Sequence, residues 1–262
     1  MNDLVFKVKP LQQVFGPVEP AEGEHYVDAI YRELRSKVVD LSLPPDMPLS
    51  EKELAAVFEA SKTPVREALI RLSRDGLVRV VPQSGTFVAP ISLDRYLEAV
   101  FIRERLETGC VLRLAGTGMS NTEMIKIKAL LTRQEEAYKA EDYGHVFSLD
   151  DQFHRTLFEF AGLAGVWSVM QSARAEIDRV RQLKTRLGIK RKKEVMAEHW
   201  AIVDAIEAKD GARADEALRQ NIGAFDAELG YLSNHPQFLD TLDSFNELVA
   251  QQRKGRRSRK LF

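Results

Sequence analysis

The sequence predicts a mainly α-helical protein with an N-terminal winged helix-turn-helix domain and a C-terminal antiparallel bundle of helices. Three observations support this fold class. Before Gly76, apolar residues recur at helical spacing in three segments, and two short runs rich in β-branched residues follow. Beyond Pro90 only long helical periods remain. The short connections between these later helices favour antiparallel neighbours.

The N-terminal domain is expected over residues 23–90. Residues 1–22 hold three prolines and little periodicity, so we expect them to form a flexible lead-in. A first helix is predicted over 24–41, because apolar side chains recur there one turn apart, at Tyr26, Ile30, Leu34 and Val38.

Local start and stop signals define the next elements. Ser50 and Glu53 have the spacing of a capping box, which predicts the start of a second helix. A third helix is expected from Thr63–Pro64 to near Gly76, since proline lacks an N–H that the first turn leaves unpaired anyway. The runs LVRVV and GTFVA, on either side of PQSG, predict a β-hairpin.

The start of the third helix carries side chains suited to DNA. The N-terminal end of a helix in the major groove reaches base edges first, and its free N–H groups attract phosphate. Lys62 and Arg66 are long enough to reach guanine O6 and N7, while Ser61 and Thr63 are short donors. Gly85 lets the hairpin turn approach the DNA backbone closely. The alternative is a surface helix with incidental charges.

One stretch resembles a known family. LSEKELAAVFEASKTPVREALIRLSRDGLVRVVPQSGTFV, residues 49–88, is similar to the DNA-binding domain of the GntR family of bacterial transcriptional regulators. The resemblance implies a winged-helix homodimer on a short palindromic operator in double-stranded DNA. Carried onto this sequence, it implies DNA contacts from Lys52, Ser61, Lys62, Thr63, Arg66 and the wing around Gly85. Many members have arginine where this chain has Lys62, so we expect Arg66 to carry more of the base reading.

The C-terminal domain is expected over residues 91–235, followed by a C-terminal helix and basic tail over 236–262. Helices are predicted near 92–116, 121–141, 143–162, 165–186, 190–208, 211–232 and 236–252. The basic runs KRKK (190–193) and RKGRRSRK (253–260) favour a solvated face and a frayed tail.

Polar side chains occupy inward positions of four of these helices. They are Arg103, Glu107, Asp150, His154, His199 and Asn221. Each alone is explained by a hydrogen bond or a salt bridge in the core. Together they predict a polar cavity, since such groups are costly to bury unpaired. Asp150 and His154 lie one turn apart on one face, and two imidazoles with a carboxylate suit zinc, nickel or manganese.

Residues 95–232 resemble the FCD-type effector domain (the FadR C-terminal domain class) of a GntR subgroup. The motifs are R-x-x-x-E at 103–107, D-x-x-F-H at 150–154 and H-x-x-I-x-x-A-I-x-x-x-D at 199–210. The resemblance implies a divalent metal on one Asp and three His, which helps to hold a small carboxylate effector. Asp150, His154 and His199 match three of these positions, whereas the fourth is Asn221.

That departure affects the expected ligands. An amide oxygen is a neutral and weaker ligand than imidazole, so Asn221 is predicted to be a weak metal ligand or a hydrogen-bond donor to the effector. Arg103 is the candidate for pairing with the effector carboxylate, because its planar guanidinium matches that group.

Composition is that of an ordinary soluble chain of 262 residues, with 44% hydrophobic and 29% charged residues. The net charge of −1 does not indicate a nucleic-acid partner, but from Lys62 to Arg79 five basic residues stand against two acidic ones. The single cysteine, Cys110, excludes an internal disulfide. Neither a signal peptide nor a run of about 20 apolar residues is present, so we expect a cytoplasmic protein without membrane association.

These observations favour a ligand-responsive DNA-binding transcriptional regulator, in this subgroup most often a repressor. One alternative is a metal-dependent hydrolase in which an Asp-His-His site activates water. The absence of a separate general base and the unexplained first 90 residues argue against an enzyme. Another alternative is an architectural DNA-binding protein without an effector, against which the inward polar residues argue.

Overall fold

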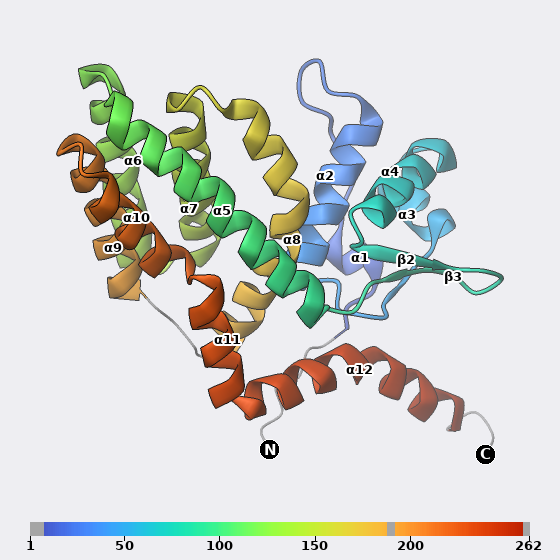
Figure 1. Cartoon of the computed structure of the whole chain (residues 1–262). Helices are drawn as coiled ribbons and strands as arrows, with labels where there is room; N and C mark the ends of the chain where they lie inside the picture. Colours follow the sequence, from blue (N-terminus) through green and yellow to red (C-terminus); the bar gives the residue numbers. More distant parts are fainter. Residues whose placement is uncertain (1–7, 188–191, 259–262) are drawn as a thin grey trace. The chain divides into compact units, whose positions relative to one another are not determined.

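The computed structural model describes residues 8–187 and 192–258, with the side chains of Ser172, 192–193 and 248–258 left undescribed. The chain forms two compact units (Figure 1). Unit 1 contains Met1–Leu93, Ala175–Leu187 and Leu232–Phe262, and unit 2 contains Asp94–Arg174 and Gly188–Tyr231. The predicted domains follow one another along the chain, whereas unit 1 also contains two later stretches, Ala175–Leu187 and Leu232–Phe262.

Unit 1 contains the predicted winged helix-turn-helix. Its helices and strands are α1 (Leu11–Val14), α2 (Tyr26–Val39), β1 (Pro48–Leu49), α3 (Glu51–Val57), α4 (Lys62–Arg74), β2 (Val78–Val81) and β3 (Gly85–Val88). The strands form an antiparallel sheet in the order β1-β3-β2, and Val80 pairs with Thr86 in the hairpin. Strand β1 was not predicted, because it is two residues long and follows a proline-rich stretch.

The core of unit 1 forms where the amphipathic faces of the helices meet. Its fully buried residues include Ile30, Leu34, Val38, Leu54, Phe58, Val65 and Leu72. The lead-in was expected to be flexible, but Leu11, Phe15 and Val18 are buried in this core. The ring of Phe15 lies 5.0 Å from that of Phe58. Apolar burial therefore holds this described part of the lead-in on α3, while residues 1–7 lie outside the described chain.

Two helices from later in the chain hold the segment after the wing in unit 1. Arg179, on α8 (Ala164–Arg186), is fully buried and donates to the carbonyl oxygens of Ala89 at 2.6 Å and Pro90 at 3.3 Å. Asn246, on α12 (Pro236–Ser258), accepts from the N–H of Ile91 at 2.8 Å and donates to its carbonyl at 3.0 Å. The segment 89–91 is therefore fixed by side chains far from it in sequence.

The described secondary-structure elements of unit 2 are all helices, so the predicted fold class is confirmed. It contains nearly all of α5 (Leu93–Thr117), the start of α8, and α6 (Asn121–Lys139), α7 (Tyr143–Phe160), α9 (Lys192–Glu207), α10 (Gly211–Ile222) and most of α11 (Phe225–Asn234). The single helix predicted over 211–232 is wrong. Gly223, with φ of 71°, ends α10, and the N–H of Phe225 at the start of α11 bonds to buried Glu104.

Within the described ranges, no helix combines the length and the apolar character needed to cross a membrane. Cys110 is a buried free thiol, and burial followed by the charge of Glu107 raises its pKa to about 12.

Candidate metal centre and DNA-binding face

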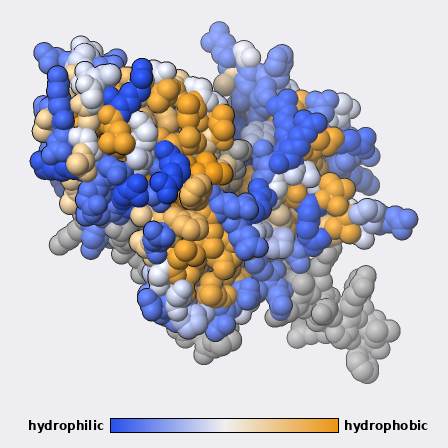
Figure 2. Space-filling model, in the orientation of Figure 1, coloured by the Kyte–Doolittle hydropathy of each residue, from blue (hydrophilic) through white to orange (hydrophobic). Residues whose placement is uncertain are grey.

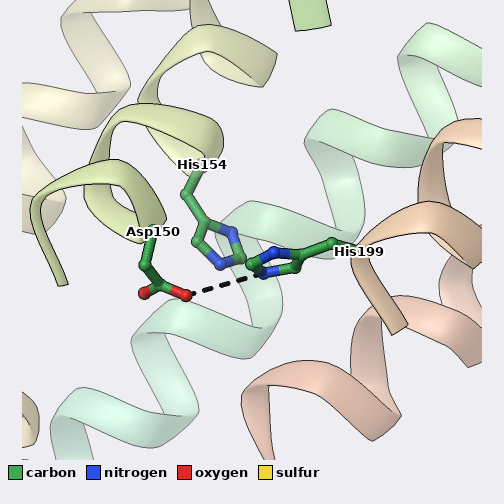
Figure 3. A group of neighbouring side chains, drawn as sticks. All are labelled: Asp150, His154 and His199. Atoms are coloured by element: carbon green, nitrogen blue, oxygen red, sulfur yellow. Dashed lines mark ion pairs between the residues drawn. The ribbon is translucent and has the colours of Figure 1, made fainter. Parts of the chain in front are cut away.

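A buried Asp-His-His cluster lies in unit 2. Asp150 and His154 project from one face of α7 toward His199 on α9 (Figure 3). All three residues are at most 3% exposed, and one ligand atom from each lies within 4.8 Å of the others. His199 Nε2 is 3.5 Å from Asp150 Oδ1. The predicted pair at i and i+4 is thus brought together with the predicted second histidine.

A carboxylate and an amide lie behind the two imidazoles. His199 Nδ1 lies 2.9 Å from Oε1 of Gln134 on α6, and His154 Nδ1 lies 2.7 Å from Glu107 Oε2 on α5. An amide oxygen and a carboxylate oxygen accept hydrogen bonds, so both contacts favour the tautomer with the proton on Nδ1. In the neutral rings, Nε2 then keeps its lone pair, which is the form that binds metals. Phe153 stacks on the ring of His199 at 4.2 Å and supports its orientation.

Arg103 and Glu107 form a buried ion pair beside His154. Arg103 Nε donates to Glu107 Oε1 at 2.6 Å, and its Nη2 lies 3.0 Å from His154 Nε2. Burial opposes ionisation of Glu107, but the charge of Arg103 and the contact with His154 Nδ1 outweigh it and hold the pKa of this carboxyl well below its usual range. The predicted Arg103 therefore lies at the cluster, next to the nitrogen that would bind a metal.

Sequence reasoning missed two residues of this site. Arg174, on α8, has Nη1 3.0 Å from Asp151 Oδ1 and Nη2 3.9 Å from Asp150 Oδ2, with its guanidinium over the ring of Trp167. Gln134 is fully buried at the imidazole of His199. A signal was present for Gln134, since it recurs at helical spacing with Leu130 and Ala137, which are both buried.

The donor set fits a divalent transition metal. Zinc bonds to histidine nitrogen and carboxylate oxygen at about 2.0–2.2 Å, which places the ligand atoms of a tetrahedral site about 3.3–3.5 Å apart. The separation of His199 Nε2 from Asp150 Oδ1 agrees with this value. Buried carboxylate and amide partners on the outer ring nitrogens are also typical of metal-binding histidines.

Asn221, predicted as the fourth ligand, has a different partner. It lies on α10, and its Nδ2 donates to Glu198 Oε2 at 3.4 Å. Among the described residues this is its only side-chain hydrogen bond.

The predicted DNA contacts lie on an exposed face of unit 1. Lys52, Ser61, Lys62, Thr63, Arg66 and Gly85 are all exposed. Ser61 is the N-cap of α4, and its side chain does not accept a capping hydrogen bond, so its hydroxyl is not used by the helix. Gly85 has φ of +115°, a conformation that other residues rarely adopt. The Arg66 guanidinium is paired with Glu51, a residue that sequence reasoning did not select.

Family models match both parts of the chain. The one described as bacterial regulatory proteins, gntR family, matches residues 27–88, and the FCD domain matches residues 98–224. The HTH-type transcriptional repressor RspR of Escherichia coli K12 is 32% identical over 206 residues, which cover 79% of this chain and 87% of RspR. An uncharacterized HTH-type regulator from an unstable DNA locus of Streptomyces ambofaciens is 34% identical, with 82% and 89% covered.

Solved structures show the same fold. Escherichia coli McbR/YncC aligns with a TM-score of 0.67 and 19% identity, covering 80% of this chain and 98% of that one. A GntR regulator from Rhodococcus sp. RHA1 aligns with a TM-score of 0.66 and 23% identity, covering 79% and 97%. The chain therefore belongs to the GntR family of bacterial regulatory proteins, as a DNA-binding transcriptional regulator with an FCD domain and not an enzyme.

Proposed function

We propose that this regulator is a repressor whose affinity for a palindromic operator is controlled by a small carboxylate bound, together with a divalent metal ion, in unit 2. The observation that carries the proposal is the buried Asp150, His154 and His199 cluster, in which both histidines present Nε2 as an acceptor. A related protein of Bacillus subtilis, 26% identical over 194 residues, is a gluconate operon transcriptional repressor, so a relative is named for an organic acid.

In this proposal zinc, nickel or manganese is held by Asp150, His154 and His199. The ion supplies a positive charge and open coordination positions for a carboxylate oxygen. Arg103 Nη2 lies 3.0 Å from His154 Nε2, so Arg103 releases this nitrogen when a metal binds and then offers a second positive group to the carboxylate. Asn221 serves as a weak ligand or as a donor to the carboxylate after leaving Glu198.

For the DNA contacts, Lys52, Ser61, Lys62, Thr63 and Gly85 are assigned to phosphates and the DNA backbone. Arg66 is assigned to a guanine. Exposure of these side chains around the start of α4 supports the assignment.

A palindromic operator requires two copies of the reading unit, and we assign the contact between copies to an apolar face of unit 2. Phe101, Ile102 and Leu112 on α5 and Leu229 on α11 are 37–46% exposed. A hydrophobic surface is visible over α5 and α11 in Figure 2. Contiguous exposed apolar surface of this kind marks an interaction site, and a second copy of the chain is the partner that the operator symmetry requires.

Helix α8 is the proposed route between the two sites. It carries Arg174, which contacts the acidic groups of unit 2, and Arg179, which holds the carbonyls of Ala89 and Pro90 in unit 1. A bound carboxylate that favours one position of Arg174 would therefore also favour one position of Arg179, because both residues lie on the same helix.

Metal titration of protein purified without a histidine tag tests the site. We expect wild-type protein to bind about one zinc ion per chain, and His154→Ala to bind it at least 100-fold more weakly. Loss of a residue that only hydrogen-bonds to a metal ligand lowers metal affinity by about 10–100-fold, and loss of a ligand itself should lower it more. His145→Ala is the matched control, since His145 is an exposed histidine on the same helix. Isothermal calorimetry and elemental analysis measure both effects. Absence of stoichiometric metal in the wild type, or equal binding by the two variants, would contradict the proposed site.

A further inference from the structure

Arg66 on α4 is bound along one edge by a carboxylate from the preceding helix. Its Nε lies 3.0 Å from Oε1 of Glu51, and its Nη2 lies 2.7 Å from Oε2. Glu51 is the first residue of α3. Its side chain is 31% exposed and that of Arg66 is 62% exposed. The hydrogen bond to Arg66 lowers the pKa of Glu51, so the carboxylate is ionised at neutral pH.

The geometry leaves the other edge of the guanidinium available. A guanidinium has five N–H donors in a fixed planar fork, and Glu51 occupies the side formed by Nε and Nη2. Among the described residues, Nη1 of Arg66 has no hydrogen-bond partner. Nη1 and the second N–H of Nη2 form the end of the fork, which can donate to O6 and N7 of a guanine in the major groove.

An exposed ion pair contributes little to fold stability, so stability alone is a weak reason for this contact. Two effects on DNA binding follow from it instead. The carboxylate fixes a long, rotatable side chain before binding, which reduces the entropy lost when it meets a base. It also offsets the charge of Arg66, which weakens attraction to phosphates on any sequence.

We infer that Glu51 is a positioning residue for sequence reading: it holds Arg66 with the free edge of its guanidinium directed at a guanine and lowers its affinity for phosphate. This inference rests on the proposed role of Arg66 in operator recognition. It adds a specificity-determining residue that does not itself contact DNA.

The test is a double-mutant cycle that combines a substitution of Glu51 with removal of the N7 acceptor of a guanine. A duplex is first selected from a randomised pool by the wild-type full-length protein, and each guanine is then replaced by 7-deazaguanine, which lacks the N7 acceptor. For the guanine read by Arg66, we expect the replacement to weaken wild-type binding about tenfold. In Glu51→Gln the same replacement should cost about threefold or less, because Arg66 is no longer aimed at N7.

Glu53→Gln is the matched control. Glu53 lies in the same first turn of α3 and carries the same charge, and the structure pairs Arg66 with Glu51 instead. This variant should lose about as much affinity on the 7-deazaguanine duplex as the wild type does. Glu51→Asp should lose more than Glu51→Gln but less than the wild type. Arg66→Lys should lose the penalty entirely, since lysine has no second donor edge.

The outcomes separate the inference from the function on which it rests. If the wild type selects a duplex and the 7-deazaguanine penalty is equal in wild type and Glu51→Gln, the inference is wrong while the proposed function stands. If Glu51→Gln only damaged the fold, binding to the guanine duplex and to the 7-deazaguanine duplex would weaken equally. The ratio of the two affinities would then stay as in the wild type, which would count against the inference. If the wild type selects no duplex, the proposed operator recognition fails and the inference fails with it.

Discussion

Replacing Arg179 with methionine is expected to lower the free energy of unfolding by about 3–5 kcal/mol. The guanidinium is fully buried, pairs with Glu176 at 3.1 Å and donates to the carbonyls of Ala89 and Pro90. Methionine has a similar length but no charge and no donor. It would therefore leave the carboxylate of Glu176 buried beside carbonyl oxygens that have lost a donor.

Urea unfolding followed by circular dichroism measures this effect, with Arg155→Met as the control. Arg155 also pairs with a glutamate on its own helix, Glu159, but the two side chains are 58% and 43% exposed. Removing an exposed pair of this kind should cost at most about 1 kcal/mol. Equal losses in the two variants would show that Arg179 does not hold the segment after the wing.

Replacing Arg66 with alanine is expected to reduce discrimination between the selected operator and a scrambled duplex by about 1–3 kcal/mol, the value of a bidentate guanine contact. The reason is the free guanidinium edge that remains while Glu51 occupies the other. Fluorescence anisotropy with both duplexes, at several salt concentrations, measures the change.

Lys62→Ala is the comparison for Arg66→Ala. Lys62 lies one turn before Arg66 on α4 and is assigned to a phosphate, so its loss should weaken binding to both duplexes about equally and reduce the salt slope by about 1. An equal loss on both duplexes for Arg66→Ala would assign Arg66 to a phosphate and remove its proposed base contact.

Local patterns were enough to predict most of the helices. Apolar residues at helical spacing, proline in the first turn of α4 and the hairpin sequence around PQSG all act within a few residues. The break at Gly223 was missed because apolar spacing continues through it from Leu218 to Phe225. The buried lead-in and the membership of Ala175–Leu187 in unit 1 depend on packing between distant segments, which periodicity does not report.

The same difference between local spacing and contacts of distant segments applies to the residues of the candidate site. Asp150 and His154 could be paired from sequence because one turn of one helix separates them, and Arg103 and Glu107 likewise. The contacts of Gln134 with His199 and of Glu51 with Arg66 join different helices, so only the fold reveals them. Arg174 was missed because α8 carries several arginines and their spacing gave no reason to single out one of them.

We propose that a small carboxylate bound at the Asp-His-His cluster controls operator affinity. This proposal is tested by the affinity of the full-length protein for its selected duplex, at fixed salt, during titration with a panel of small carboxylates with and without zinc. We expect that at least one carboxylate changes this affinity by about 5–150-fold, that zinc is required, and that His154→Ala abolishes the response while His145→Ala does not. Affinity that stays constant across the panel in the presence of zinc, nickel and manganese would contradict it.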